Sequence, residues 1–148
     1  MAEFIESYNN DSSVGLLATP INTSVAARTF LKNLPLYREG LSPLLRGLEV
    51  GMAHGYFVMG PFLKLGPLRG TEYATYIAYA CTIAIIGVLL LAMFLYGSIA
   101  YQDESKFAKN PRLIDSMIFS SEQWSQFISG VGVGGLGGAT VVFLIYSL

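Results

Sequence analysis

Residues 73–101 read YATYIAYACTIAIIGVLLLAMFLYGSIAY, a run without a single charged side chain. About 20 apolar residues in a helix suffice to cross the hydrocarbon core of a bilayer. Tyrosines gather toward both ends of the run, as aromatic side chains do at membrane–water interfaces. The run therefore predicts a transmembrane helix at about 73–100, and with it an integral membrane protein.

A second run, WSQFISGVGVGGLGGATVVFLIYSL at residues 124–148, also lacks charge and predicts a span at about 124–147. Gly130, Gly134 and Gly138 follow one another at four-residue spacing, with further glycines between them. Small residues at this spacing let another backbone approach closely. Two interpretations are open: packing against another helix of the same protein, or a flat groove for a partner helix or a pigment ring.

The stretch before these runs predicts a further span at about 44–63, although it carries Arg46, Glu49 and His54. A surface helix of a soluble domain would show one charged face, but GMAHGYFVMGPF at residues 51–62 has no charge to form one. The sequence therefore predicts an all-α integral membrane fold with three transmembrane helices.

Composition agrees with a membrane protein that has little soluble body. The 148 residues are 53% hydrophobic and 13% charged, whereas about a quarter of the residues of a soluble domain are charged. A net charge of -1 leaves no surplus of cations to bind a phosphate backbone, which argues against nucleic-acid partners. Residues 1–40 predict an irregular extramembrane arm with a short amphipathic helix at about 23–33, and residues 41–148 a transmembrane domain.

The distribution of Lys and Arg predicts the orientation in the membrane. One side of the predicted spans carries most of these residues: Arg28, Lys32, Arg38 and Arg46 before the first span, and Lys106, Lys109 and Arg112 between the second and third. Only Lys64 and Arg69 lie on the other side. The positive-inside rule then places the arm on the cytoplasmic or stromal side and the carboxyl terminus on the opposite side.

Glu49 and His54 are the candidate functional residues, because an ionisable group inside a membrane helix is costly unless it is paired, liganded or hydrated. Glu49 could form an intrahelical ion pair with Arg46, three residues earlier. His54 could be a neutral histidine hydrogen-bonded to a neighbouring helix. The alternative for both is ligation, because a carboxylate oxygen or an imidazole nitrogen can donate an electron pair to a metal ion.

Helix geometry separates the two side chains. Five residues rotate an α-helix by about 500°, which leaves Glu49 and His54 about 140° apart in azimuth and about 7.5 Å apart along the axis. They cannot easily share one ion, so the geometry permits one axial ligand each to separate macrocycles. Two other functions stay open: a small transporter or channel subunit that uses both residues as a proton path, and a purely structural scaffold. We find no catalytic motif and expect no enzyme activity.

Three longer stretches resemble one known family. They are LATPINTS (residues 17–24), RGLEVGMAHGYFVMGPFLKLGPLRG (46–70) and SSEQWSQFISGVGVGGLGG (120–138). The chain resembles subunit XI of the photosystem I reaction centre, also called subunit L, over most of its length.

That resemblance implies a three-helix, non-catalytic subunit at the edge of photosystem I in the thylakoid membrane. It also implies bound chlorophyll a, a carotenoid such as beta-carotene, and lipid, with contacts to the photosystem core, to neighbouring small membrane subunits and to antenna proteins. Glu49 and His54 match the family positions that ligate the central magnesium of separate chlorophylls.

Two departures bear on trimer formation, which the family mediates in cyanobacteria. Trimer-forming relatives have an acidic residue after the PLR tripeptide, at a calcium site between complexes, whereas this chain has Gly70, with Glu72 two positions later. The sequence also stops at Leu148, where those relatives continue. We therefore expect no trimer contact and favour a monomeric photosystem of an algal plastid, with a cyanobacterial source as the alternative.

Overall fold

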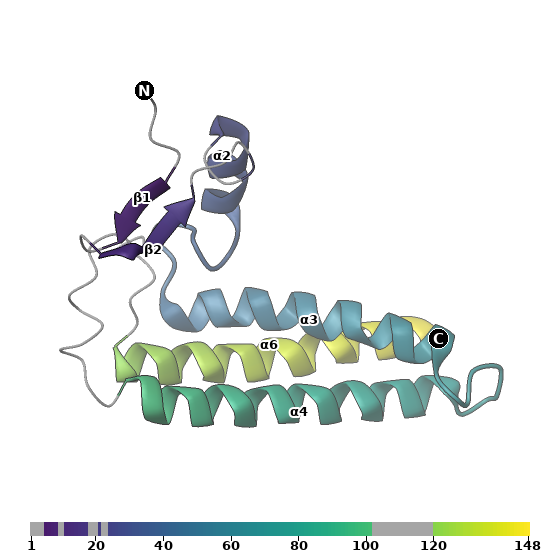
Figure 1. The fold of residues 1–148 in the computed structure, drawn as a ribbon. Helices are drawn as coiled ribbons and strands as arrows, with labels where there is room; N and C mark the ends of the chain where they lie inside the picture. The colour runs from purple at the N-terminus through teal and green to yellow at the C-terminus, as the bar shows by residue number, and fades with distance from the viewer. Residues whose placement is uncertain (1–4, 9–10, 18–20, 22–23, 102–119) are drawn as a thin grey trace.

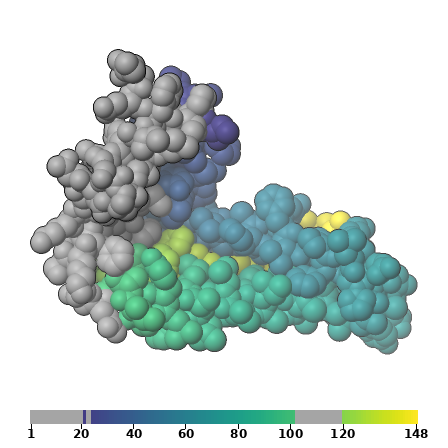
Figure 2. Space-filling view, in the orientation of Figure 1, coloured from purple at the N-terminus to yellow at the C-terminus, as the bar shows by residue number. Residues whose placement is uncertain are grey.

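The computed structural model describes residues 5–8, 11–17, 21, 24–101 and 120–148. In chain order the elements are β1 (Ile5–Tyr8), β2 (Asp11–Leu17), α2 (Val25–Asn33), α3 (Pro43–Leu65), α4 (Ala74–Ala100) and α6 (Ser121–Ser147). The three long helices lie side by side in an elongated bundle, with α2 and the strand pair at one end of it (Figure 1). In Figure 2 the surface of α2 projects from the bundle of long helices at this end.

Helix α3 confirms the helix predicted at 44–63 to within two residues at each end. It begins after Ser42, whose hydroxyl oxygen accepts a hydrogen bond from the Leu45 backbone N–H at 3.3 Å. Pro43 occupies the first turn, where its missing N–H has no helical partner to lose. The helix ends at Leu65, and the C-cap Gly66 and Pro67 follow it.

Two of the described helices, α4 and α6, are long and apolar enough to cross a membrane. Helix α3 has 23 residues, which rise about 34 Å at 1.5 Å per residue and match the thickness of a bilayer core. Its polar side chains leave α3 less apolar on average than α4 or α6. Length alone does not establish a third span, so the crossing by α3 stays a prediction.

Helix α6 begins three residues before the predicted start at Trp124, and a capping box explains the difference. The Ser120 hydroxyl oxygen accepts from the Gln123 backbone N–H at 3.2 Å, and the Gln123 side-chain oxygen accepts from the Ser120 backbone N–H at 3.0 Å. This reciprocal pair satisfies two backbone donors at the start of the helix. The pattern Ser-x-x-Gln was visible in the sequence but was not used.

The arm contains a strand pair that the sequence did not predict, while the other described elements are helical, as predicted. Strands β1 and β2 pair antiparallel, with Ile5 opposite Leu17 and Glu6 opposite Leu16. Helix α2 confirms the short helix predicted at 23–33. The cations used to predict the orientation between the second and third spans, Lys106, Lys109 and Arg112, lie outside the described residues.

Helices α3 and α6 run parallel and touch through their backbones. The contact consists of three glycines on each helix at four-residue spacing, namely Gly47, Gly51 and Gly55 on α3 and Gly130, Gly134 and Gly138 on α6. A β-carbon placed on any of them would overlap a backbone carbonyl oxygen of the opposite helix. The first interpretation of the α6 glycines, packing within the protein, is therefore confirmed.

Helix α4 runs antiparallel to this pair and packs on it at both ends (Figure 1). At one end Met59 and Leu63 of α3 meet Ala78 of α4 and Val142 of α6 in a buried apolar cluster. Near the middle, the Ile86 side chain lies against Gly135 of α6. Most larger side chains of α4 point outward, where lipid or a partner can cover them.

Candidate functional site

Glu49 and His54 both lie on α3, away from the glycine face that meets α6. Gly51 and Gly55 are buried against α6, whereas the Glu49 side chain is 37% exposed and His54 is exposed. Both residues belong to one continuous helix, so the separation of about 140° expected from the spacing holds. The structure presents the two groups on different sides of the outer surface and does not bring them together.

The ion-pair partner of Glu49 is Arg38 and not Arg46. Arg38 Nη1 lies 3.2 Å from Glu49 Oε1, and 42% of the Arg38 side chain is exposed. Arg46 is buried and donates from Nε to the Leu41 carbonyl at 3.1 Å and from Nη1 to the Leu36 carbonyl at 2.9 Å. Arg46 therefore holds the segment between α2 and α3 against the start of α3.

Arg38 also contacts the end of α2. Its Nε and Nη2 donate to the backbone carbonyl of Asn33, the last residue of α2, at 3.3 and 3.1 Å. The Arg38 backbone N–H donates to the Leu34 carbonyl at 2.9 Å, within the turn that follows α2. One guanidinium thus joins the end of α2 to the outward face of α3.

The hydrogen bond of His54 determines which ring nitrogen can act as a ligand. Nδ1 lies 2.7 Å from the Val50 carbonyl oxygen, one turn earlier in the same helix. A carbonyl only accepts, so Nδ1 carries the proton and a neutral ring keeps its lone pair on Nε2. A bond within α3 therefore takes the place of a bond to a neighbouring helix, which was one of the two alternatives for His54, and it leaves an electron-pair donor at the exposed surface.

Aromatic side chains cluster where α4 ends and α6 begins. Trp124 lies within 5.4 Å of Tyr101, 5.6 Å of Phe127 and 5.7 Å of Tyr96, measured between ring centroids. Its Nε1 donates to the Met93 carbonyl at 3.0 Å. Burial raises the pKa of the Tyr101 phenol, and nearby Tyr96 raises it further. These rings, expected at the membrane interface, also fasten α6 to α4.

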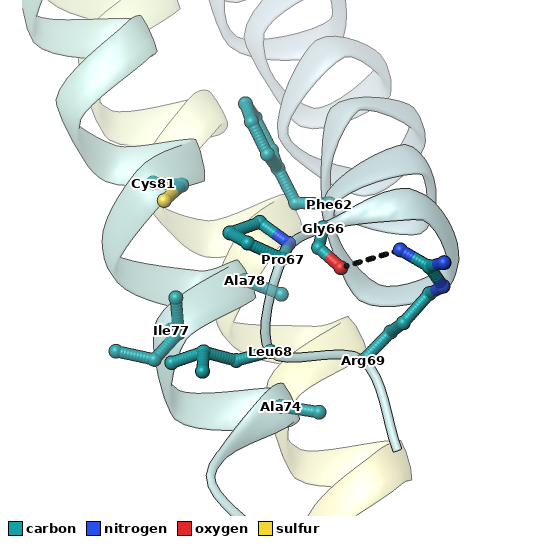
Figure 3. Close-up of a pocket in the computed structure, with 9 residues that line it drawn as sticks. All are labelled: Phe62, Gly66, Pro67, Leu68, Arg69, Ala74, Ile77, Ala78 and Cys81. Carbon is teal, nitrogen blue, oxygen red and sulfur yellow. Dashed lines mark hydrogen bonds between the residues drawn. The ribbon is translucent and has the colours of Figure 1, made fainter. Parts of the chain in front are cut away.

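At the other end of the bundle a shallow pocket lies between the end of α3 and the start of α4 (Figure 3). It is open to the surface, and its lining is mostly apolar, including Phe62, Pro67, Ile77 and Cys81. The Arg69 side chain turns away from it and donates to the Gly66 carbonyl at 3.4 Å. The pocket offers a hydrophobic contact and no ligating group comparable to His54.

The sequence did not indicate two features of this surface. Arg38 was counted only as a charge on one side of the membrane, although it is the partner of Glu49. Gly47, Gly51 and Gly55 were not recognised as the counterpart of the α6 glycines, although their four-residue spacing is visible in residues 46–62. Without a fold, nothing assigned these glycines to a shared interface.

Together these features define a class: a helical membrane subunit with parallel, backbone-packed helices and two separate electron-pair donors on its outer surface. A family model described as photosystem I reaction centre subunit XI matches residues 4–148. The chain belongs to this photosystem I reaction centre subunit XI family.

Similar proteins of that name occur in algae and cyanobacteria. The subunit of Isochrysis galbana is 46% identical over 145 residues, covering 98% of this chain and 94% of its own length. That of Cyanidioschyzon merolae is 44% identical over 148 residues, covering 100% and 99%. That of Trichodesmium erythraeum is 45% identical over 142 residues, covering 96% and 84%. These matches do not support the transporter or channel alternative.

Proposed function

We propose that the chain is a structural subunit of photosystem I in the thylakoid membrane and that it holds two chlorophylls through Glu49 and His54. Family membership supports the structural role within the complex. The ligand roles rest on the side chains. The observation that carries the proposal is the Nδ1 hydrogen bond of His54 to the Val50 carbonyl, which leaves the lone pair of a neutral ring on Nε2.

The two residues fit the chemistry of a magnesium macrocycle. Its magnesium ion would accept an oxygen or a nitrogen donor, and Glu49 and His54 offer one of each on different sides of α3. An ionisable side chain on the outer face of a membrane helix is tolerated when a ligand or a partner compensates for lost water. When bound, chlorophyll supplies light absorption and energy transfer, while the residues of this chain hold and orient it.

We further propose a three-span topology with a stromal amino terminus and a lumenal carboxyl terminus. Helix α3 lies parallel to α6 over at least nine residues of backbone contact, from Gly47 to Gly55. Because α6 is apolar and long enough to cross, a helix packed directly on its backbone shares its depth in the membrane. The exposed apolar side chains of α4, such as Val88, Leu91 and Phe94, offer surface for carotenoid, lipid or antenna proteins.

The same proposal includes the absence of a calcium-linked trimer contact. Gly70 lies at a φ of 84° and carries no carboxylate, whereas the resemblance to the family implies an acidic residue at this position in trimer-forming members. A metal bridge between complexes at this position would lack that ligand.

Removing one ligand at a time tests the pigment proposal. In the complete photosystem, His54→Leu and Glu49→Leu are each expected to lower the chlorophyll content by about one molecule per subunit, as one axial bond is lost. Pigment extraction and the absorption difference spectrum measure this loss, and helical circular dichroism checks the fold. Phe57→Leu on the same helix is the control because its exposed ring offers no ligand. An unchanged pigment content in both ligand variants would contradict the proposal.

A further inference from the structure

We propose that Arg38 is a positioning residue for the Glu49 ligand: it binds one carboxylate oxygen so that the other faces a chlorophyll magnesium. The inference deepens the proposed function and rests on it. The salt bridge between Arg38 Nη1 and Glu49 Oε1, at 3.2 Å, is the contact that carries it.

The Arg38 guanidinium is itself held in place from the other side. The carbonyl of Asn33 is at the end of α2, where helix carbonyls have no partner within the helix. Arg38 Nε and Nη2 both donate to it, at 3.3 and 3.1 Å. Because the guanidinium is planar and rigid, these two bonds fix the direction in which Nη1 points.

The carboxylate keeps a second oxygen for a ligand. A carboxylate accepts through both oxygens, and among the described residues only Oε1 of Glu49 has a recorded partner. The positive charge of Arg38 lies 3.2 Å from the carboxylate and balances its negative charge while the second oxygen stays available to donate an electron pair to magnesium. Arg38 therefore supplies both the orientation and the charge balance that a carboxylate ligand needs in a membrane helix.

Folding stability is a weak alternative explanation for this contact. Both side chains are about two-fifths exposed, at 42% and 37%, and exposed ion pairs contribute little to stability. The connection between the arm and α3 is already made by the buried Arg46, which bonds the Leu36 and Leu41 carbonyls. The structural connection thus rests on Arg46, and the contact of Arg38 with the outward-facing Glu49 carboxylate is left for another role.

Five variants of the chain, each in the complete photosystem, test this role. They are Glu49→Leu, Arg38→Gln, Arg38→Lys, the double variant Arg38→Gln with Glu49→Leu, and the control Arg28→Gln. Arg28 is an exposed cation of α2, so its removal changes the net charge of the arm by the same amount. The readouts are chlorophyll retained through a detergent wash series and the absorption difference spectrum.

Glu49→Leu should remove about one chlorophyll, and Arg38→Gln should weaken retention of the same pigment about 10- to 100-fold, as loss of an outer-shell partner does. Its difference spectrum should show the same band. Arg38→Lys keeps the positive charge but lacks the planar guanidinium with its several N–H donors, and it should retain more pigment than Arg38→Gln. In the Glu49→Leu background, Arg38→Gln should add no further loss.

The outcomes separate this inference from the function on which it rests. If Glu49→Leu leaves the pigment unchanged, ligation by Glu49 fails, and the role of Arg38 fails with it. If Glu49→Leu loses pigment but Arg38→Gln matches Arg28→Gln in retention and spectrum, only the Arg38 inference is overturned. If the Arg38→Gln subunit does not accumulate, the Arg38→Lys variant tests the inference in its place. A wild-type absorption band together with wild-type chlorophyll retention in Arg38→Lys would overturn it.

Discussion

The backbones of Gly51 and Val131 touch directly: a β-carbon on Gly51 would overlap the Val131 carbonyl oxygen and lie 2.8 Å from the Gly135 backbone nitrogen. Close backbone approach of this kind maximises dispersion contacts, which drive helix association where lipid removes the hydrophobic effect between helices. The same contact recurs one turn earlier, between Gly47 and Phe127, and one turn later, between Gly55 and Gly135. These repeated backbone contacts fix the relative register of α3 and α6.

Gly134→Ala is expected to destabilise the bundle. Its methyl group would overlap the Leu48 carbonyl and lie 2.8 Å from the Met52 backbone nitrogen, and helix backbones cannot yield as side chains do. We expect a loss of about 1–3 kcal/mol, as for other overpacked sites. Denaturant unfolding of the full-length chain in micelles, followed by helical circular dichroism, measures it.

Gly137→Ala is the matched control for that variant, in the same helix. A β-carbon there meets nothing within 4 Å, so alanine should leave stability unchanged or raise it by up to about 1 kcal/mol through helix propensity. Equal effects of the two substitutions would show that α3 and α6 do not pack backbone to backbone.

Tyr79 and Thr140 form a hydrogen bond between α4 and α6 that should show up in a double-mutant cycle. The Thr140 hydroxyl donates to the Leu136 carbonyl at 2.8 Å, so the Tyr79 hydroxyl is the donor in the 2.9 Å contact with Thr140. Tyr79→Phe should cost about 0.6 kcal/mol, a typical value inside membranes. In a Thr140→Val background it should cost nothing more.

Tyr76→Phe is the control for that cycle, because Tyr76 lies on the same helix with an exposed side chain. Its hydroxyl removal should change stability by a few tenths of a kcal/mol at most, as surface substitutions do. Strict additivity of Tyr79→Phe and Thr140→Val would argue that no bond joins the two hydroxyls.

Gly97→Ala should displace the Trp124 ring. A β-carbon on Gly97 would overlap ring atoms of Trp124, whose Nε1 donates to the Met93 carbonyl at 3.0 Å. Moving the ring breaks this bond, at a cost of about 1 kcal/mol. Trp124 is the one tryptophan of the chain, so its emission reports the change directly, and we expect a red shift in the full-length chain in micelles.

Gly87→Ala on the same helix provides the comparison for Gly97→Ala. Gly87 has no atom within 4 Å of the added carbon, so both the emission maximum and the unfolding transition should stay at their wild-type values. A wild-type emission maximum in Gly97→Ala would mean that the ring does not lie on Gly97.

The three long helices were predictable because long apolar runs are a local property of the chain. Runs 73–101 and 124–148 indicated α4 and α6, and the span predicted at 44–63 falls within two residues of each end of α3, although the caps Ser42 and Gly66 did not enter that prediction. The β1–β2 hairpin was missed because residues 5–17 show no clear alternation of polar and apolar side chains.

The partners of the candidate residues could not be predicted, because they depend on contacts distant in sequence or on rotamers. Helical spacing suggested Arg46 for Glu49, but the chain reverses before α3 and brings Arg38, eleven residues earlier, to the carboxylate instead. His54 bonds the carbonyl of Val50, which any histidine in a helix could do. Ligation of chlorophyll by either residue stays a prediction.

Labelling from the two sides of the membrane tests whether α3 crosses it. In a Cys81→Ser chain, which has no other cysteine, single substitutions Glu39→Cys, Glu72→Cys and Glu122→Cys place thiols before α3, after α3 and at the start of α6. All three positions are exposed glutamates, so the substitutions match in charge and accessibility. A membrane-impermeant maleimide, applied to oriented thylakoid vesicles and detected on the purified chain, reports the side of each thiol.

Since α3 and α6 run parallel and α4 returns between them, residues 39 and 122 should be labelled from the stromal side and residue 72 from the lumenal side. Labelling of residues 39 and 72 from one side would show that α3 lies on the membrane and that only α4 and α6 span it.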